Sequence, residues 1–597
     1  MNDYLQQIIA DSLQQFDLEE LPEIQTEAPK DASHGDASTN VAMMLAKPLS
    51  NNPRAIAQQI IDGLKYDEKK ISSVEIAGPG FINFRFAEDY LYDELQSILD
   101  AGFGFGRTDE HSGKKVLVEF VSANPTGPLT VGHGRNAVLG DTVARLLEWT
   151  GAEVDREYYF NDAGRQMRVL GQSLRFRYYK HLYDFIEKYN SNLYQRLSKK
   201  DNVSFPEDGY QGRYISDIAY QYLTIKIADV LKELPIKFFE KINNGENSSF
   251  NLEKIFQDKD CLIKLFEKGK HLHIYRYTRK AEKAIFADIS NTLQRMNINM
   301  DSFFNEHSLY ADGSIDSTVE KLREKELVYD KDGAVWFKTT EFGKEQDTVL
   351  IKSTGEPTYR LPDIAYHMNK LDRGYDLCLD VFGADHIATY PDVLSGISAL
   401  GYDKDKVDVV IYQFVTIVKD GQPFKMSTRK ANFVTLDELM DEVGSDVTRF
   451  FFLMRSPNTH LEFDIAQAKE AGDKNPVFYL QYAHARIASI LRKAEEEYSF
   501  SKEADLSLLK HNSEESLIKT ILRFPEMIAG SANAREPHRL INFLNDVASA
   551  FTGFYHDCRI IGVDEDLAQA RIELAKATAQ VLRNGLTILG ISAPENM

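Results

Sequence analysis

The segment VLVEFVSANPTGPLTVGHGRNAVLGD, from Val116 to Asp141, decides the fold of this chain. Its first six residues, Val116 to Val121, are almost all apolar, which is typical of a strand buried in a parallel sheet. Apolar residues then recur at helical spacing, at Val131, Val138, Leu139, Val143, Leu146 and Leu147. The sequence therefore predicts a strand, a loop broken by Pro and Gly, and a helix, as in a doubly wound α/β sheet.

The turn between that strand and that helix is suited to binding an anion. It brings His133 and free backbone N–H groups to one place, where the helix dipole favours negative charge. Gly132 and Gly134 leave room for a phosphate or a ribose to approach the backbone. A downstream loop, GQPFKMSTRKANFVTL, has a composition suited to holding a polyphosphate, with Lys425, Ser427 and Arg429. We interpret the two segments together as an ATP site.

Length and composition limit the class of protein. A chain of 597 residues exceeds what one hydrophobic core can serve, so three or four domains are expected. The formal charge of −21 argues against a general electrostatic binder of DNA or RNA, so any contact with a nucleic acid must use local basic and aromatic patches. The cysteines, Cys261, Cys378 and Cys558, lie far apart, so neither a zinc site nor a disulfide framework is indicated.

The chain carries no evident targeting or membrane signal. Its first residues, MNDYLQQIIADSLQQF, are amphipathic and acidic, without the basic and apolar regions of a secretory signal. No later run approaches the length of a membrane span. We expect a cytoplasmic protein in a reducing compartment and, because no dimerisation feature stands out, a monomer.

Patterning divides the chain into three units. Residues 1–105 combine helices near Tyr4 to Phe16 and Pro53 to Leu64 with the strand-like VEIAGPGFINFRF, which predicts a small α+β domain. Residues 110–440 alternate strands and helices around a helical insertion at about 172–325, and the sheet is expected to resume with AVWFKTT and TVLIKSTGEPTYRLPDIAYHM, then CLDVFGADHIATYPDVL. Residues 445–597 have the periodicity of an all-α helical bundle.

Two short strings identify a family. Thr130-Val131-Gly132-His133 resembles the HIGH signature of class I aminoacyl-tRNA synthetases, and Lys425-Met426-Ser427-Thr428-Arg429 resembles their KMSKS signature. The wider strings ANPTGPLTVGH, NDAGRQM, GADH, VTLDELMDEVG and NPVFYLQYAHARI resemble the arginyl-tRNA synthetase subgroup. Thr130 replaces the first His and Thr428 the second Lys. Arg429, which is always cationic, or Lys430 can take over the role of that lysine.

The resemblance implies a Rossmann-like catalytic domain that uses ATP, as its Mg²⁺ complex, with L-arginine and tRNA(Arg), and no zinc. Arginine's carboxylate attacks the α-phosphorus of ATP to give arginyl-adenylate, and the terminal 2′-hydroxyl of tRNA then takes the arginyl group; activation waits for bound tRNA. Catalytic roles are implied for His133, Lys425 and Arg429. The implied nucleotide site comprises the HIGH-like region Ala123, Asn124, Pro125, Thr126, Gly127, Pro128, Leu129, Thr130, Val131, Gly132 and His133, together with Gly134, Asp385, His386, Lys425, Met426 and Ser427.

Carboxylates are expected to hold the guanidinium of arginine, because a buried cation without an acidic partner is very costly. Tyr359 and Asp363 are spaced i, i+4, so a helix there would present a phenol and a carboxylate on one face. The family carries its arginine-specific acid at a matching Tyr-x-x-x-Asp. By resemblance, Glu119 and Ser122 help to hold the substrate and Asn124 its α-amino end.

Two surfaces are expected to meet tRNA. By resemblance, residues 1–105 contact the elbow of tRNA and the bundle 445–597 recognises the anticodon. In the bundle, aromatic and cationic side chains able to stack unpaired bases lie close in sequence: Tyr479, Gln481, Tyr482, His484 and Arg486. From the residues alone, the same set fits core aromatics with a partly exposed Arg, and residues 1–105 fit a packing module.

Three other functions remain open at this point. A class I synthetase for another amino acid is one, although Glu119 and Asp363 favour a cationic substrate. The second alternative is a nucleotidylyltransferase, which shares an HxGH motif but should lack a C-terminal RNA-binding bundle. The third alternative is a synthetase-like RNA-binding or regulatory protein that has lost catalysis, because both signatures are imperfect. Exchange of pyrophosphate into ATP, with each amino acid and with or without tRNA, separates these alternatives.

Overall fold

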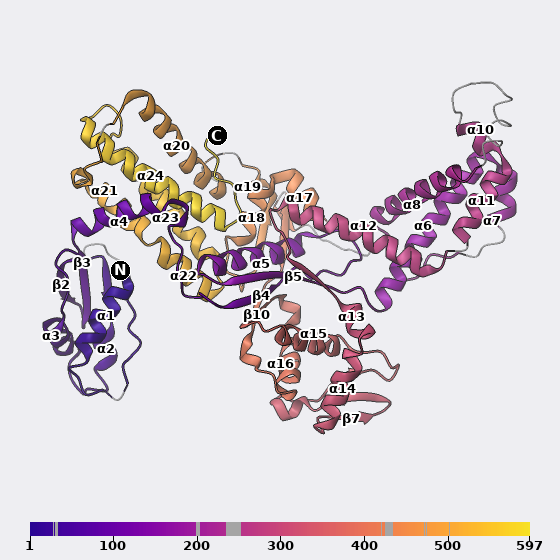
Figure 1. Ribbon diagram of the computed structural model, residues 1–597, viewed down its shortest axis with the longest axis horizontal. Helices are drawn as coiled ribbons and strands as arrows, with labels where there is room; N and C mark the ends of the chain where they lie inside the picture. Colours follow the sequence, from indigo (N-terminus) through magenta and orange to yellow (C-terminus); the bar gives the residue numbers. More distant parts are fainter. Residues whose placement is uncertain are drawn as a thin grey trace.

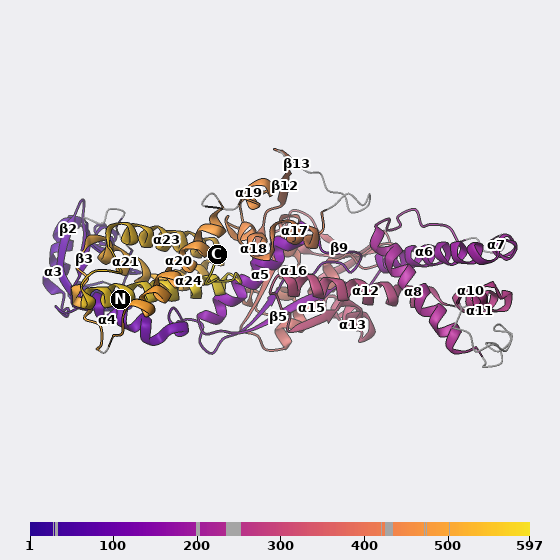
Figure 2. The ribbon, with the colours of Figure 1, turned by 90° about the horizontal axis from the view of Figure 1, so that it is seen from above.

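The computed structural model describes residues 1–18, 20–27, 29, 34–198, 203–234, 252–270, 272–419, 421–423, 434–470, 472, 475–500 and 502–597. The molecule is elongated (Figures 1 and 2): an N-terminal unit and a helical bundle lie at one end, a parallel sheet lies in the centre, and a helical arm extends to the other end. Within those residues, no helix combines the length and the apolar character needed to cross a bilayer.

The N-terminal unit is a small α+β fold with its own hydrophobic core. Its antiparallel sheet has the strand order β1-β3-β2. The N-cap of α3 is Asn52, whose side chain accepts a hydrogen bond from the backbone N–H of Arg54 at 2.9 Å. The elements of this unit are α1 (Asn2–Leu13), β1 (Ala37–Thr39), α2 (Val41–Leu45), α3 (Pro53–Gly63), β2 (Ile71–Ala77) and β3 (Phe81–Phe86); α4 (Glu88–Ala101) leads on to the centre.

The central sheet has five parallel strands in the order β11-β10-β4-β5-β6. They are β4 (Lys115–Glu119), β5 (Glu153–Phe160), β6 (Ser302–Asn305), β10 (Leu377–Gly383) and β11 (Val407–Tyr412). The predicted strand and helix of the opening segment are confirmed as β4 and α5 (Val131–Trp149). The order reverses between β4 and β10, so the carboxyl ends of these two strands form the switch point at which open α/β sheets bind ligands.

A helical arm connects β5 to β6 (Figure 1). It ends at Arg295, earlier than the predicted limit of about 325, because residues 302–305 form an edge strand of the parallel sheet. The arm has an aromatic core in which the Tyr178, Tyr222 and Tyr277 rings lie 5.5–5.8 Å apart. Its helices are α6 (Arg165–Tyr189), α7 (Ser191–Ser198), α8 (Arg213–Lys232), α10 (Leu252–Gln257), α11 (Lys259–Lys270) and α12 (Ile274–Arg295).

A second insertion separates β6 from β10. The prediction that AVWFKTT and the start of TVLIKSTGEPTYRLPDIAYHM continue the parallel sheet is wrong, because these strands, β8 (Ala334–Phe337) and β9 (Thr348–Ile351), pair antiparallel with each other in a separate small sheet, β7-β8-β9. An apolar run does not by itself specify its partner strand. The prediction for CLDVFGADHIATYPDVL is confirmed, because its first residues lie in β10, a strand of the parallel sheet. The other elements here are α13 (Glu306–Ala311), α14 (Ser314–Glu324), β7 (Val328–Lys331), α15 (Arg360–Asp372) and, between β10 and β11, α16 (Tyr390–Ala399).

The last part of the chain is helical apart from a small sheet, β13-β12-β14. Its bundle shares one hydrophobic core with the central sheet and α5; for example, the Phe524 ring packs 6.4 Å from that of Trp149. The elements are β12 (Val415–Lys419), β13 (Gln422–Pro423), α17 (Leu436–Val443), α18 (Ser445–Leu453), β14 (Leu461–Asp464), α19 (Ile465–Ala468), α20 (Pro476–Glu497), α21 (Asn512–Leu522), α22 (Phe524–Ala534), α23 (His538–Asp557) and α24 (Glu565–Ile588).

Candidate active site

The loop that follows β4 is strained and firmly held. Val121 and Ser122 have φ angles of 66° and 39°, in the left-handed region that a β-branched residue rarely adopts. The backbone N–H of Val121 donates to Oδ1 of Asn136 at 2.6 Å, and Nδ2 of Asn136 donates to the carbonyl of Val381 at 2.8 Å. These bonds tie the ends of β4, α5 and β10 together. Backbone strain of this kind concentrates at functional sites.

His133 is held in one tautomer at the N-terminus of α5. Thr130 is the N-cap of this helix, and its backbone N–H donates to Nδ1 of His133 at 3.1 Å, as in a capping box. The proton of a neutral imidazole then sits on Nε2. Burial lowers the pKa of His133 to about 4, so the ring is neutral near pH 7. Its Nε2–H is therefore available as a donor beside the helix N-terminus.

The second predicted signature, Lys425, Met426, Ser427, Thr428 and Arg429, lies outside the described residues, as does Lys430. The residues that follow this segment are described from Val434 onward. Thr435 forms an antiparallel bridge with Thr130, and the backbone N–H of Leu436 donates to the carbonyl of Leu129 at 2.8 Å. The chain therefore returns from this signature directly to the N-terminus of α5.

Gly132 and Gly134 have different surroundings. A Cβ atom at Gly132 would meet only Oγ1 of Thr130, at 3.8 Å, so this position is open to a ligand. A Cβ atom at Gly134 would lie 2.7 Å from both Leu436 and Phe452. The interpretation that Gly134 leaves room for a ligand is therefore wrong; the absence of a side chain there lets α17 and α18 pack on α5.

Asp363 is a carboxylate without a partner. The backbone N–H of Asp363 donates to the carbonyl of Tyr359 at 3.3 Å, so the predicted i, i+4 helical geometry is confirmed, with Pro362 in the first turn. Burial, with Glu119 and Glu306 nearby, raises the pKa of Asp363 to about 7. Within the described part of the chain, its side chain accepts no hydrogen bond and forms no ion pair. Tyr359 itself is 76% exposed.

Glu119, in contrast, already has partners for both oxygens. Its Oε1 accepts a hydrogen bond from Ser122 at 2.8 Å, and its Oε2 lies 2.5 Å from Nζ of Lys370. Nζ of Lys370 also lies 2.6 Å from Oδ1 of Asp380, whose Oδ2 lies 2.6 Å from Nε2 of His367. We call Glu119, His367, Lys370 and Asp380 the carboxyl-edge network, because they join α15 to the ends of β4 and β10.

Sequence reasoning missed several residues of this site: Tyr159, Glu306, His367, Lys370 and Asp380. Glu306 is buried, and its Oε2 accepts a hydrogen bond from the Tyr159 hydroxyl at 3.0 Å. A signal was present for part of the set. Asp363, Tyr366, His367 and Lys370 recur at i, i+3, i+4 and i+7, which makes one polar stripe along a helix. On a helix that packs against a sheet, such a stripe indicates buried polar contacts.

The remaining predicted nucleotide-site residues differ in exposure, since Ala123, Pro125 and Leu129 are buried. Asn124, Asp385 and His386 are exposed, and the His386 ring stacks on Phe382 at 4.9 Å. The HIGH-like loop also contacts the arm, because the Tyr214 hydroxyl on α8 donates to the carbonyl of Thr126 at 2.5 Å. The arm is thus fixed to the loop that follows β4.

The predicted tRNA residues of α20 divide between two surfaces. The Arg486 guanidinium lies over the rings of Tyr555 and Tyr482, at 4.3 and 5.9 Å, and both tyrosines are partly exposed. Tyr479 faces the same helix, α23, through Thr552. Gln481 lies apart from them, since its Nε2 donates to Asp446 and to the carbonyl of Ser592. His484 is buried and contacts the carbonyl of Pro594.

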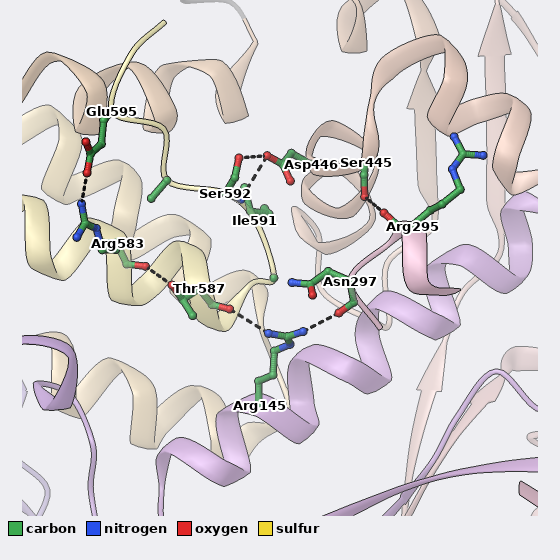
Figure 3. Close-up of a pocket in the computed structure, with 12 residues that line it drawn as sticks. Arg145, Arg295, Asn297, Ser445, Asp446, Arg583, Thr587, Ile591, Ser592 and Glu595 are labelled. Carbon is green, nitrogen blue, oxygen red and sulfur yellow. Dashed lines mark hydrogen bonds and ion pairs between the residues drawn. The ribbon is translucent and has the colours of Figure 1, made fainter. Parts of the chain in front are cut away.

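A cavity of about 550 Å³ lies elsewhere, where α5, α12, α18 and the C-terminus meet (Figure 3). It is lined by three arginines that already have acidic partners: Arg145 pairs with Asp141, Arg295 with Asp437 and Asp441, and Arg583 with Glu595. None of the predicted site residues lines it. We therefore place the candidate site at the strand ends and not in this cavity.

Comparison with known families covers nearly the whole chain. The family described as arginyl tRNA synthetase N terminal domain matches residues 3–86, the class I (R) tRNA synthetase catalytic domain matches 94–228 and 212–455, and the DALR anticodon binding domain matches 480–597. The arginine–tRNA ligase of Salinibacter ruber is 52% identical over 100% of both chains. The chain belongs to the arginyl-tRNA synthetase family.

Further relatives of this synthetase family agree. The arginine–tRNA ligase of Desulfotalea psychrophila is 47% identical, over 96% of this chain and 94% of its own. The solved structure of Thermus thermophilus arginyl-tRNA synthetase, at 22% identity, shares the fold with a TM-score of 0.72 over all of both chains. Arginyl-tRNA synthetases are ATP-using ligases, so the chain is an enzyme. The nucleotidylyltransferase alternative predicted a chain without an RNA-binding bundle and is excluded by the anticodon-domain match.

Proposed function

We propose that this chain joins L-arginine to tRNA(Arg) at the carboxyl edge of its parallel sheet, in two steps driven by ATP. The observation that carries the site assignment is Asp363, a half-buried carboxylate that has no partner within the described residues and has Glu119 and Glu306 nearby. A guanidinium supplies the missing partner, since it binds a carboxylate through two parallel hydrogen bonds. Tyr359, one helical turn before Asp363, and Asn124, in the loop after β4, are exposed and are proposed to contact the rest of arginine.

In the first step, a carboxylate oxygen of arginine forms a bond to the α-phosphorus of ATP, and the bond between that phosphorus and the β-bridging oxygen breaks. Pyrophosphate leaves with the electron pair. The neutral His133 donates from Nε2, and the N-terminus of α5 adds its backbone N–H groups. Lys425 and Arg429 are proposed to hold the leaving phosphates, since their segment returns to Thr130. Mg²⁺ enters with ATP, held mainly by phosphate oxygens.

In the second step, the 2′-hydroxyl of the terminal adenosine of tRNA attacks the carbonyl carbon of arginyl-adenylate, and AMP leaves with the electron pair. We propose that residues 1–105 hold the elbow of tRNA and that the surface made by Tyr482, Arg486 and Tyr555 stacks bases of the anticodon loop. We propose that the chain works as a monomer in the cytoplasm.

Pyrophosphate exchange into ATP tests the function. With tRNA(Arg) present, exchange is expected with arginine and with no other proteinogenic amino acid, and omission of tRNA tests the implied coupling. Replacing Lys425 by Ala should reduce exchange by roughly 10²-fold or more, as loss of a preorganised electrostatic donor does. Exchange that is supported equally by lysine, or unchanged in Lys425→Ala, contradicts the proposal.

Binding of tRNA tests the bundle surface separately. Arg486→Ala should weaken the affinity for tRNA(Arg) by about tenfold, because one stacked contact is worth roughly 1–3 kcal/mol. Lys576→Ala removes the same charge from α24, where Lys576 pairs with Glu573, and is the matched control. The surface assignment fails if both variants bind equally well, or if changes in the anticodon bases leave binding by the unmodified protein unaltered.

A further inference from the structure

Lys370 is a fully buried cation beside the proposed guanidinium position. It lies on α15, seven residues after Asp363, and its side chain has 0% exposure. Its Nζ contacts Glu119 on β4 and Asp380 on β10, at 2.5 and 2.6 Å, and lies 4.3 Å from the centre of the Tyr366 ring. Glu119 and Asp380 are register partners on neighbouring parallel strands. One ammonium therefore joins both strands of the switch point to the helix that carries Asp363.

The charges of this network leave one carboxylate for a ligand. Glu119 and Asp380 with Lys370 carry a net charge of −1 when all are ionised, and their oxygens accept hydrogen bonds from Ser122, Lys370 and His367. In contrast, the side chain of Asp363 has no hydrogen bond or ion pair within the described residues. Without Lys370, the two adjacent buried carboxylates of Glu119 and Asp380 would face each other, with the His367 ring as the remaining partner of Asp380.

We propose that Lys370 is a positioning residue for arginine recognition. It fixes the carboxylates of Glu119 and Asp380 in one geometry and offsets their charge, so that Asp363 meets the guanidinium in its ionised form. This inference rests on the proposed function, because it takes arginine as the ligand of Asp363.

The groups that face Asp363 set the direction of its titration. Glu119 on β4 and Glu306 on α13 disfavour its ionised form, whereas His367 and Lys370 on α15 favour it. The hydroxyls of Tyr159 on β5 and Tyr310 on α13 are also near, and both donate to Glu306. Lys370 faces Glu119, Asp380 and Cys378. Removing Lys370 therefore raises the pKa of Asp363, and a higher pH is needed to form the charge that binds arginine.

The test compares the full-length enzyme with Lys370→Met, which keeps length and apolar bulk but removes the charge. We expect KM for arginine to rise about tenfold or more near pH 7, KM for ATP to change less than twofold, and the acidic limb of kcat/KM for arginine to move up by about one pH unit. A merely structural role predicts equal losses for arginine and ATP and an unmoved limb, and that result overturns the proposal.

The double variant Lys370→Met with Asp380→Asn keeps the proposal testable if the single variant folds poorly. It leaves Glu119 as the one charge of the network, so the net charge is again −1. The acidic limb should return to within about 0.3 pH units of the unmodified enzyme, while KM for arginine stays raised because nothing holds Glu119. A double variant with unmodified KM for arginine refutes positioning by Lys370. Loss of arginine-dependent exchange in the unmodified enzyme is a different result, which refutes the proposed function.

Discussion

The molecule has two buried networks of acidic and basic side chains, and the pKa values of the aspartates beside them are shifted in opposite directions. The first, which we call the junction network, is Asp141 with Arg145, Arg156 and Arg449: Asp141 is 1% exposed, with the three arginines at 2.8, 3.5 and 2.6 Å. Burial alone would raise the pKa of Asp141, but the arginines hold it below its usual value. At the carboxyl edge, burial leaves the pKa of Asp363 raised to about 7.

The difference separates a structural network from a ligand site. The guanidinium of Arg449 also donates to the carbonyls of Leu589 and Met296, and Arg145 donates to those of Asn297 and Thr587 (Figure 3). The junction network thus joins α5, α18, the end of α24 and the end of the arm, and its one carboxylate, Asp141, has three cationic partners. The carboxylates of Glu119 and Asp380 in the carboxyl-edge network also have partners, whereas the neighbouring Asp363 has none among the described residues. An unmatched buried charge is costly, so we expect it where a substrate of opposite charge binds.

The largest expected effect comes from removing the charge of Asp363 at the carboxyl edge. Asp363→Asn should lower kcat/KM for arginine by about 30- to 5,000-fold, because removing the charge of one partner of a desolvated charge pair costs roughly 2–5 kcal/mol. Asp141→Asn makes the same chemical change in the junction network and is the control, with kcat/KM for arginine expected within a few-fold for the folded protein. Steady-state exchange kinetics measure both. Equal loss in the two variants removes the distinction between the networks.

The next largest effect comes from removing a cation of the junction network. Arg449→Met should reduce the free energy of unfolding by about 3–5 kcal/mol, since removing one member of a buried pair leaves an uncompensated charge. KM for arginine at a permissive temperature should stay within twofold. Chemical denaturation followed by circular dichroism measures the first quantity. An unchanged unfolding midpoint contradicts a structural role for the junction network.

The sequence predicted those parts of the site that depend on local pattern. The strand and helix around His133 and the i, i+4 pair Tyr359 and Asp363 follow from periodicity, which only nearby residues determine. The sheet partner of a four-residue strand such as β6 does not, because strand pairing joins residues far apart in the chain. β8 and β9 were misplaced for the same reason.

The carboxyl-edge network shows the same limit for side chains. Lys370 and Glu119 are 251 residues apart, and nothing in the local sequence of either distinguishes a buried ion pair from two solvated charges. The polar stripe of α15 indicates that its residues have partners but not which partners. Tertiary packing selects them, and it also leaves Asp363 without one.

Replacing Asp363 or Asp141 by Asn is expected to change the free energy of unfolding at pH 8 in opposite directions. The pKa of Asp363 is raised to about 7, so the folded state binds its proton more tightly than the unfolded chain, and this stabilisation is lost as pH rises from about 4 through 7. Asp363→Asn should therefore increase the free energy of unfolding at pH 8, by about 1–3 kcal/mol, and change it little at pH 4. Asp141→Asn should decrease it at pH 8, because the pKa of Asp141 is lowered.

Denaturation of both variants and the unmodified protein at pH 8 measures these differences. An Asp363→Asn protein that is less stable than the unmodified one at pH 8 would falsify the assignment of Asp363 as an unmatched charge. Added arginine supplies the matching cation, so it should stabilise the unmodified protein more than Asp363→Asn.

The smallest effect concerns the rim of the junction network and the independence of the two networks. Arg145 is 20% exposed, and Asp141 keeps Arg449 and Arg156 without it, so Arg145→Met should cost only about 1 kcal/mol of unfolding free energy. The networks share no residue, so combining Arg145→Met with Asp363→Asn should give additive stability changes, within about 0.5 kcal/mol. A larger coupling energy would mean that the junction network interacts with the charge of Asp363. The junction network and the carboxyl-edge site would then not be independent.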